Sequence, residues 1–258
     1  MSTLSVVVIT KNEEAKLTRC LDSIKPLADD VIIVDDVSTD NTTKIAQQFG
    51  AKVIINESNG NFAGQRNIGV ENSCCEWILQ MDADEVVPVE TVDKIRAAIN
   101  NPGNFSAFEI RRKNFFMGHP IKYSGNYGYA LKIFKKGAGW YEGVIHESLK
   151  IDGSVGKIDA DVEHYPFGSI YDVIARANFY SDLESLEFLK KVDSVSERKI
   201  RYELTVASIK RFWKLYVKKR GYKDGMHGFI WGILNVIGPQ IRWIKIWEAA
   251  RKQSKLVK

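Results

Sequence analysis

Two aspartates separated by a single residue have the spacing in this 258-residue chain that most directly suggests chemistry. Asp82 and Asp84 follow the apolar run 77–79, which has the composition of a buried strand. Because residues i and i+2 of an extended chain face the same side, we expect both carboxylates to converge on one ligand. Two like charges so close together are costly unless a cation or hydrogen-bond donors stabilise them. A hard divalent ion, of the kind that bridges to phosphates, suits such a pair.

The elements that must position this pair form a regular series. Apolar runs of strand length occupy residues 4–10, 31–34, 51–55 and 77–81, and helical patterns lie between them. This alternation predicts a doubly wound α/β sheet, in which ligands bind beyond the carboxyl ends of the strands. Thr10, Asp35 and Asp36 fall at strand ends, as Asp82 and Asp84 do. Four carboxylates on one sheet edge predict a site for a nucleotide and a metal.

The individual residues leave a plainer interpretation open. Asp35, Asp36 and Asp40 have the side chains that cap helices and close turns. Arg66 is equally consistent with a charge on the surface of a helix.

Four motifs in order make the functional interpretation specific. They resemble the successive motifs of family 2 glycosyltransferases over about residues 1–150: residues 5–14 (SVVVITKNEE), 34–42 (VDDVSTDNT), 66–69 (RNIG) and 81–85 (MDADE). The resemblance implies a GT-A fold, which is Rossmann-like, a nucleotide-sugar donor and an inverting transfer.

The resemblance also implies a role for each matching residue. Thr10 and Glu13 would line the nucleotide pocket, and Asp36, with Asp35 beside it, matches the acidic position that hydrogen-bonds the uracil. Arg66 matches a basic residue near the base or the diphosphate, Asp82 a position near the ribose, and Asp84 the metal ligand.

Val37 departs from the family pattern, which usually has glycine at this position. A β-branched residue disfavours a left-handed backbone. We therefore expect the turn after Asp36 to differ from that of the family and the pocket itself to be retained.

A second chemical candidate is the His-Glu pair in residues 143–147 (GVIHE). Sugar transfer needs a base that takes the proton of the attacking hydroxyl. We predict Glu147 as this base, and His146 as a ligand of the metal or of the leaving diphosphate that also orients the base. The Gly-x-x-His-Glu setting resembles a bacterial subgroup of family 2 related to lipopolysaccharide inner-core β-1,4-glucosyltransferases. A structural His-Glu pair is the alternative, and His164 is expected to be an ordinary loop histidine.

Charge divides the chain into two predicted domains, a catalytic domain at 1–168 and a basic, amphipathic helical region at 169–258. From Arg198 onward there are 16 Lys and Arg against 3 acidic residues, whereas the rest carries 21 against 29. Helical patterns begin at Ser169 and cover about 203–220, and the apolar run 229–238 is expected to end at Pro239.

The basic region is expected to contact a membrane without crossing it. A spanning helix needs about 20 apolar residues, and the run before Pro239 is much shorter. Tryptophan and tyrosine beside lysine and arginine are typical of the membrane interface. The alternative is that the aromatic side chains pack on the catalytic domain. The tail also resembles that of the core-glycosyltransferase subgroup, which implies an anionic glycolipid acceptor at the inner membrane face.

The compartment follows from the cysteines and the N-terminus. Cys20, Cys74 and Cys75 are odd in number and lack metal-ligand spacing, and the run 5–10 is too short for a signal peptide. We therefore expect a reduced, cytoplasmic protein at the inner face of the cytoplasmic membrane.

Together these features predict a metal-dependent inverting glycosyltransferase. It would use Mg²⁺ or Mn²⁺ and move a hexose, glucose from UDP-glucose, onto the lipopolysaccharide inner core or a related glycolipid. The alternatives are transfer to another cell-surface polysaccharide or protein-linked glycan, a non-catalytic nucleotide-sugar binder, a nucleotidyltransferase and a nucleic-acid binder. The nucleotidyltransferase would need a Gly-rich, Lys-containing N-terminal loop, and the nucleic-acid binder a recognisable motif; the sequence has neither.

Overall fold

The computed structural model describes residues 1–124, 127–143 and 147–257, and the chain forms two compact units. Unit 1 comprises residues 1–113 and 128–164, and unit 2 comprises residues 114–127 and 165–258. Unit 2 thus includes a segment, residues 114–127, from within the range 1–168 of the predicted catalytic domain.

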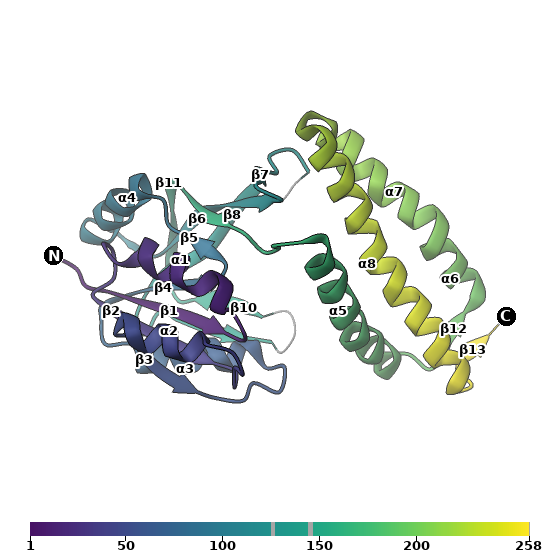
Figure 1. Cartoon of the computed structure of the whole chain (residues 1–258), viewed down its shortest axis with the longest axis horizontal. Coiled ribbons are helices and arrows are strands. Elements are labelled where there is room, and N and C mark those ends of the chain that lie inside the picture. The colour runs from purple at the N-terminus through teal and green to yellow at the C-terminus, as the bar shows by residue number, and fades with distance from the viewer. Residues whose placement is uncertain (125–126, 144–146, 258) are drawn as a thin grey trace. The chain divides into compact units, whose positions relative to one another are not determined.

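Unit 1 is built on a sheet whose first half is parallel (Figure 1). Four strands lie in the order β3-β2-β1-β4 and pair in parallel. They are β1 (Leu4–Thr10), β2 (Asp30–Asp35), β3 (Lys52–Ile55) and β4 (Trp77–Asp82). Thr10 is paired with Asp35, and Ile9 with Asp82, so the carboxyl ends of three strands meet at one edge, as the sequence predicts.

Helices cover both faces of this parallel half, which is why its strands are apolar almost throughout. The helices are α1 (Glu14–Ile24), α2 (Thr42–Phe49), α3 (Phe62–Asn72) and α4 (Val89–Asn100). Val6 and Val8 pack in the core that contains residues of α1, α2 and α4, whereas Val7 packs with Ala63 of α3. Gly69 of α3 allows close contact with β1, because an added Cβ would lie 2.2 Å from a methyl of Val7.

The second half of the sheet carries strands that bring further side chains to the same edge. β4 pairs antiparallel with β8 (Tyr127–Lys135), and the order continues through β6 (Phe105–Phe116), β11 (Ser154–His164) and β5 (Glu85–Val86). β7 (His119–Pro120) pairs with β6. A separate hairpin of β9 (Gly139–Glu142) and β10 (Ser148–Ile151) packs Tyr141 against α3 and Phe134.

Unit 2 is helical. It contains α5 (Ile170–Lys191), a helix of four successive segments, and α8 (Gly225–Lys252), with α8 between the other two (Figure 1). The segments are α6 (Glu197–Tyr202), η1 (Glu203–Ala207), α7 (Ser208–Trp213) and η2 (Lys214–Lys218), of which η1 and η2 are π-helical. The short elements η3 (Gly221–Asp224), β12 (Val195–Ser196) and β13 (Leu256–Val257) complete the unit.

Helix α8 runs through Pro239, so the predicted break there is wrong. A proline removes one backbone donor from a helix interior. This loss is tolerated because α8 buries Trp231 before the proline and Trp243 and Ile246 after it. Within the described residues, no helix combines the length and the apolarity needed to cross a membrane.

Candidate active site

A turn at the end of β4 sets the geometry of the acidic triplet. Asp82 is the last residue of β4, Ala83 and Asp84 form the turn, and Glu85 begins β5. Glu85 is fully buried, and its Oε2 accepts the Asp82 N–H at 3.0 Å and pairs with Lys132 at 2.7 Å. The backbone is therefore not extended through Asp84. A turn thus replaces the extended chain predicted through Asp84, and the convergence of both carboxylates on one ligand stays a prediction.

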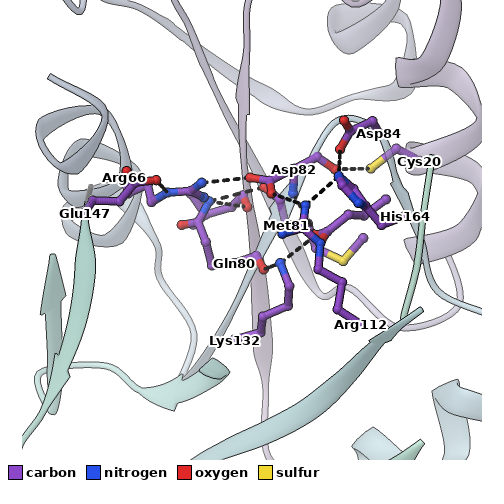
Figure 2. Close-up of polar contacts among 12 residues, drawn as sticks. Cys20, Arg66, Gln80, Met81, Asp82, Asp84, Arg112, Lys132, Glu147 and His164 are labelled. Atoms are coloured by element: carbon purple, nitrogen blue, oxygen red, sulfur yellow. Dashed lines mark hydrogen bonds and ion pairs between the residues drawn. The ribbon is translucent and has the colours of Figure 1, made fainter. Parts of the chain in front are cut away.

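Asp82 is held between two arginines (Figure 2). Arg66 Nη2 donates to Oδ1 at 2.8 Å, and Arg112 Nη2 lies 3.4 Å from Oδ2. Burial alone would raise the pKa of Asp82, but the positive charges of Arg66, Lys132 and Arg112 lower it far below its ordinary value. Asp82 is therefore ionised at any physiological pH.

Asp84 faces a histidine from another strand. Its buried Oδ1 lies 3.4 Å from Nε2 of His164 at the end of β11. Burial alone would raise the pKa of Asp84, but the contact with His164 lowers it below its ordinary value. Arg112 Nη2 lies 2.5 Å from the same Nε2. Nε2 has either one proton or one lone pair, so the tautomer of His164 decides whether it donates to Asp84 or accepts from Arg112.

The Asp84 carboxylate fits a divalent cation. A carboxylate oxygen is an ordinary ligand of Mg²⁺ and Mn²⁺, and a cation would satisfy the buried Oδ1, which has no hydrogen-bond partner at normal geometry among the described residues. Asp82 and Asp84 do not belong to any described group of three ligand side chains with ligand atoms within 4.8 Å of one another. The predicted ligand His146 lies outside the described residues.

Arg66 links Asp82 to the predicted base. Its Nε lies 3.3 Å from Oε1 of Glu147, and its guanidinium lies over the Tyr141 ring at 5.5 Å from the centroid. Asn67 fixes this arrangement, because its side chain exchanges two hydrogen bonds with the backbone of Tyr141, at 2.8 and 2.9 Å. The Arg-Asn pair of α3 thus positions strand β9, which precedes Glu147.

The predicted nucleotide-pocket residues lie at the ends of β1 and β2. Asp35 is fully buried, and Thr10 Oγ1 donates to it at 2.8 Å. Ser38 binds the same carboxylate through its backbone N–H, at 2.8 Å, and through its hydroxyl, at 2.5 Å. Asp35 therefore stabilises the turn. Glu13 is held in place by its backbone N–H, which donates to Thr42 Oγ1 at 2.8 Å.

Asp36 is bound by residues outside the turn that Asp35 stabilises. Its carboxylate accepts from the backbone N–H and the hydroxyl of Ser58, both at 2.8 Å, and pairs with Lys11 at 2.9 Å. Burial raises the pKa of Asp36, but these hydrogen bonds and the Lys11 charge lower it to a net value below the usual range.

Val37 adopts the left-handed conformation that was not expected of it, with φ of +52°. The two hydrogen bonds from Ser38 to Asp35 close the turn, and Val37 itself is half exposed, so its side chain meets little resistance from neighbours. The predicted change of the turn is therefore wrong: the valine accepts a backbone strain that glycine would not have.

Four residues of this cluster had no assigned role in the sequence analysis: Glu85, Arg112, Lys132 and His164. Arg112, Lys132 and His164 lie on strands distant in sequence. The sequence of β11 does have the alternating pattern of a strand, because the buried residues Ile158, Ala160 and Val162 alternate with charged residues. His164 is the next side chain in that series, so it ends a strand and is not a loop residue.

The cysteines lie in two settings. Burial, together with the charges of Glu85 and Asp84, raises the pKa of the Cys20 thiol, whose Sγ lies 3.6 Å from the carbonyl of Asp82. Asp30, Cys74 and Cys75 place ligand atoms within 4.8 Å of one another, although their sequence spacing did not suggest it. These three residues lie at strand beginnings, at the opposite edge of the sheet from Asp82.

Comparison with known proteins agrees with this geometry. Residues 5–148 match the model of glycosyl transferase family 2. An uncharacterized glycosyltransferase of Rickettsia felis is 30% identical over 273 residues, covering 100% of this chain and 94% of that protein. The lipopolysaccharide core biosynthesis glycosyltransferase LpsC of Rhizobium meliloti is 24% identical, covering 95% of this chain and 92% of LpsC.

Solved structures confirm the GT-A fold. Residues 1–349 of S. aureus TarS superpose with a TM-score of 0.50 at 17% identity, covering 99% of this chain and 93% of that one. The same fragment has also been solved in complex with UDP-GlcNAc. The motifs, the sheet and the family match lead to one conclusion: this chain is a member of glycosyl transferase family 2, with the GT-A fold and additional C-terminal helices.

Proposed function

We propose that this family 2 glycosyltransferase is an inverting hexosyltransferase that moves glucose from UDP-glucose onto the inner core of lipopolysaccharide or a related glycolipid. The observation that carries the proposal is the cluster at the end of β4, where Asp82, Asp84 and Glu147 are joined through Arg66, Arg112 and His164. Such a cluster of charged side chains can bind a charged diphosphate leaving group and, next to it, the hydroxyl that attacks the sugar.

Glu147 acts as the base in this proposal. Its carboxylate takes the proton of an acceptor hydroxyl, whose oxygen attacks the anomeric carbon from the side opposite the diphosphate. The bond between that carbon and the diphosphate oxygen breaks, and UDP leaves with the electron pair. The anomeric centre inverts, because attack and departure occur on opposite faces. Arg66 orients Glu147 through the 3.3 Å pair.

The donor is held by residues at the strand ends. Asp36 accepts a hydrogen bond from the uracil, Thr10 and Glu13 line the pocket, Asp35 supports the turn, and Asp82 orients the ribose. Asp84 would hold a divalent cation, Mg²⁺ or Mn²⁺, with Asp82 and His146 as the other predicted ligands. When bound, this cation supplies charge that offsets the charge developing on the diphosphate.

The acceptor part of the proposal rests on likeness and charge. LpsC, by its name, serves lipopolysaccharide core biosynthesis, and it aligns with 95% of this chain. The 13 surplus positive charges from residue 198 onward favour an anionic acceptor and peripheral contact with the inner face of the cytoplasmic membrane. Transfer to another surface polysaccharide or protein-linked glycan is the alternative that the same site supports.

A panel of nucleotide sugars tests the proposal. The purified protein is incubated with Mn²⁺, each donor and core oligosaccharide, and released UDP and the product anomer are measured. We expect UDP release with UDP-glucose and a β-linked product from the α-linked donor. A retained α-linkage would contradict inversion, pyrophosphate release would indicate a nucleotidyltransferase, and donor binding without turnover would indicate a regulatory binder.

A further inference from the structure

Unit 2 carries a segment whose positive charge is not neutralised by the protein. Between Thr205 and Lys223 there are seven cationic residues and no acidic one: Lys210, Arg211, Lys214, Lys218, Lys219, Arg220 and Lys223. None of the seven forms an ion pair with a carboxylate in the described part of the chain, whereas Arg201 pairs with Glu197 and Arg242 pairs with Glu184. A bound anion would therefore relieve the repulsion among these cations.

Four of these cations border a hollow of about 620 Å³ between α7–η2 and α8. Its wall on α8 includes Gly238 and Pro239, which bring no long side chain, and this explains why the surface recedes there. We call it the basic hollow; it is lined by Lys210, Arg211, Lys214, Leu215, Lys219, Leu234, Asn235, Gly238 and Pro239. The lining contains no carboxylate, and its remaining side chains are mainly apolar.

An apolar strip runs beside the cations on the same helix. Ile209 and Trp213 are 69% and 55% exposed, and residues four apart lie on one helical face. Lys210 adjoins both, being next to Ile209 and three residues before Trp213. Exposed tryptophan and isoleucine beside lysines form the pattern of a helix that lies in a membrane interface.

The combination favours a lipid over the other polyanions that bind basic grooves. A nucleic acid would use the cations and the Trp213 ring, but it offers nothing to the exposed Ile209 or to the Leu and Pro walls of the hollow. A phospholipid matches both the cations and the apolar side chains: its phosphate binds the cations, and its acyl region contacts the apolar side chains.

We propose that the basic hollow binds the phosphate headgroup of an anionic phospholipid, while Ile209 and Trp213 enter the bilayer beside it. This inference deepens the membrane contact of the proposed function and rests on it. It assigns the contact to one surface of unit 2 and identifies the phosphate as the group recognised there.

Vesicle co-sedimentation of the full-length protein tests the inference. The vesicles are phosphatidylcholine alone or phosphatidylcholine with phosphatidylglycerol, and the test variant carries Lys210→Gln, Arg211→Gln and Lys214→Gln. We expect wild-type protein to prefer the anionic vesicles and the variant to bind them about 100-fold more weakly, near fivefold for each charge removed. Trp213→Ala is expected to weaken binding to both kinds of vesicle.

A matched control removes three charges elsewhere. Lys25, Lys44 and Lys150 are exposed residues of unit 1, and their replacement by Gln changes the net charge equally. We expect this control to bind within about twofold of wild type, because screening limits the effect of distant charges. Equal weakening by both triple variants would overturn the inference, since binding would then depend on net charge alone.

Two further arms separate the possible anions. Inorganic phosphate or a single-stranded oligonucleotide is added as a competitor, and the UDP released from UDP-glucose is measured in parallel. Tighter binding of free phosphate or of the oligonucleotide than of anionic vesicles would overturn the assignment to lipid. If wild-type protein binds no vesicle but still releases UDP, the membrane contact fails and the transferase proposal stands; if only the triple-variant effect is missing, this inference alone fails.

Discussion

Arg66 donates to Asp82 at 2.8 Å and lies 3.3 Å from Glu147, so one guanidinium joins the end of β4 to the residue that we assign as the base. The two carboxylates belong to segments 65 residues apart in the sequence. Their separation is therefore set by the position of a single side chain on α3.

Replacing Arg66 by Lys is expected to lower kcat/KM about 100-fold. A lysine keeps the charge but offers a single nitrogen, which cannot bind both carboxylates with the geometry of the planar guanidinium. The measurement is UDP release over a range of UDP-glucose concentrations. Arg96→Lys is the control, because Arg96 pairs with Asp29 and not with a residue of the cluster in the described part of the chain; the activity of this variant should be unchanged.

Glu147→Gln is expected to lower kcat by a factor of about 10³ with little change in KM for the donor, because the amide cannot take the proton of the acceptor. Single-turnover transfer and donor binding are measured separately. Glu142→Gln is the matched control on the preceding strand, where the carboxylate only accepts from Trp140. A Glu147→Gln variant with wild-type kcat would show that another group is the base.

Asp84→Asn is expected to remove the thermal stabilisation that Mn²⁺ gives to the wild-type protein. An ion that binds only the folded state at about 100 times its Kd stabilises it by about 2.7 kcal/mol, and the neutral amide is a much poorer ligand. Melting temperatures with and without Mn²⁺ measure the difference. Asp93→Asn, on the exposed face of α4, should keep the full shift. If Asp84→Asn also keeps it, the cation is bound elsewhere.

Asp36→Asn is expected to destabilise the fold by about 2 kcal/mol at neutral pH, because charge-assisted hydrogen bonds from Ser58 and Lys11 are weakened. The folded-state pKa of Asp36 is lowered. Its contribution to stability is therefore complete above the unfolded pKa near 3.9, and is lost as the pH falls through the folded value. Urea unfolding at neutral and acidic pH should show the gap between wild type and variant closing at low pH. If the difference in unfolding free energy between wild type and variant did not depend on pH, the charge of Asp36 would not be the cause of that difference.

Val37→Gly is expected to stabilise the protein by about 1 kcal/mol. The left-handed backbone costs a valine about 1–2 kcal/mol, and the added flexibility of glycine in the unfolded chain takes back part of the gain. Val89→Gly is the control, because Val89 is also exposed to solvent but begins α4 without a positive φ, so its replacement should destabilise. Loss of stability in Val37→Gly would show that the valine side chain makes a contribution larger than the strain.

The sequence alone determined the sheet edge and its acidic residues. The runs 4–10, 31–34, 51–55 and 77–81 are apolar because their strands are covered on both faces, and this pattern located Thr10, Asp35, Asp36 and Asp82 at strand ends. The motif resemblance identified the family, which the match over residues 5–148 confirms. Local patterns of this kind are visible in the sequence because each depends only on neighbours along the chain.

Only the tertiary structure decided how the charges are paired. Arg112, Lys132 and His164 come from β6, β8 and β11, and their distance from Asp82, Asp84 and Glu85 depends on the order of strands in the sheet. A turn at Ala83 and Asp84 replaces the straight strand from which the placement of the two aspartates was predicted. Likewise, Val37 is left-handed and α8 continues through Pro239 because hydrogen bonds and packing from other elements outweigh the local preferences of the two residues.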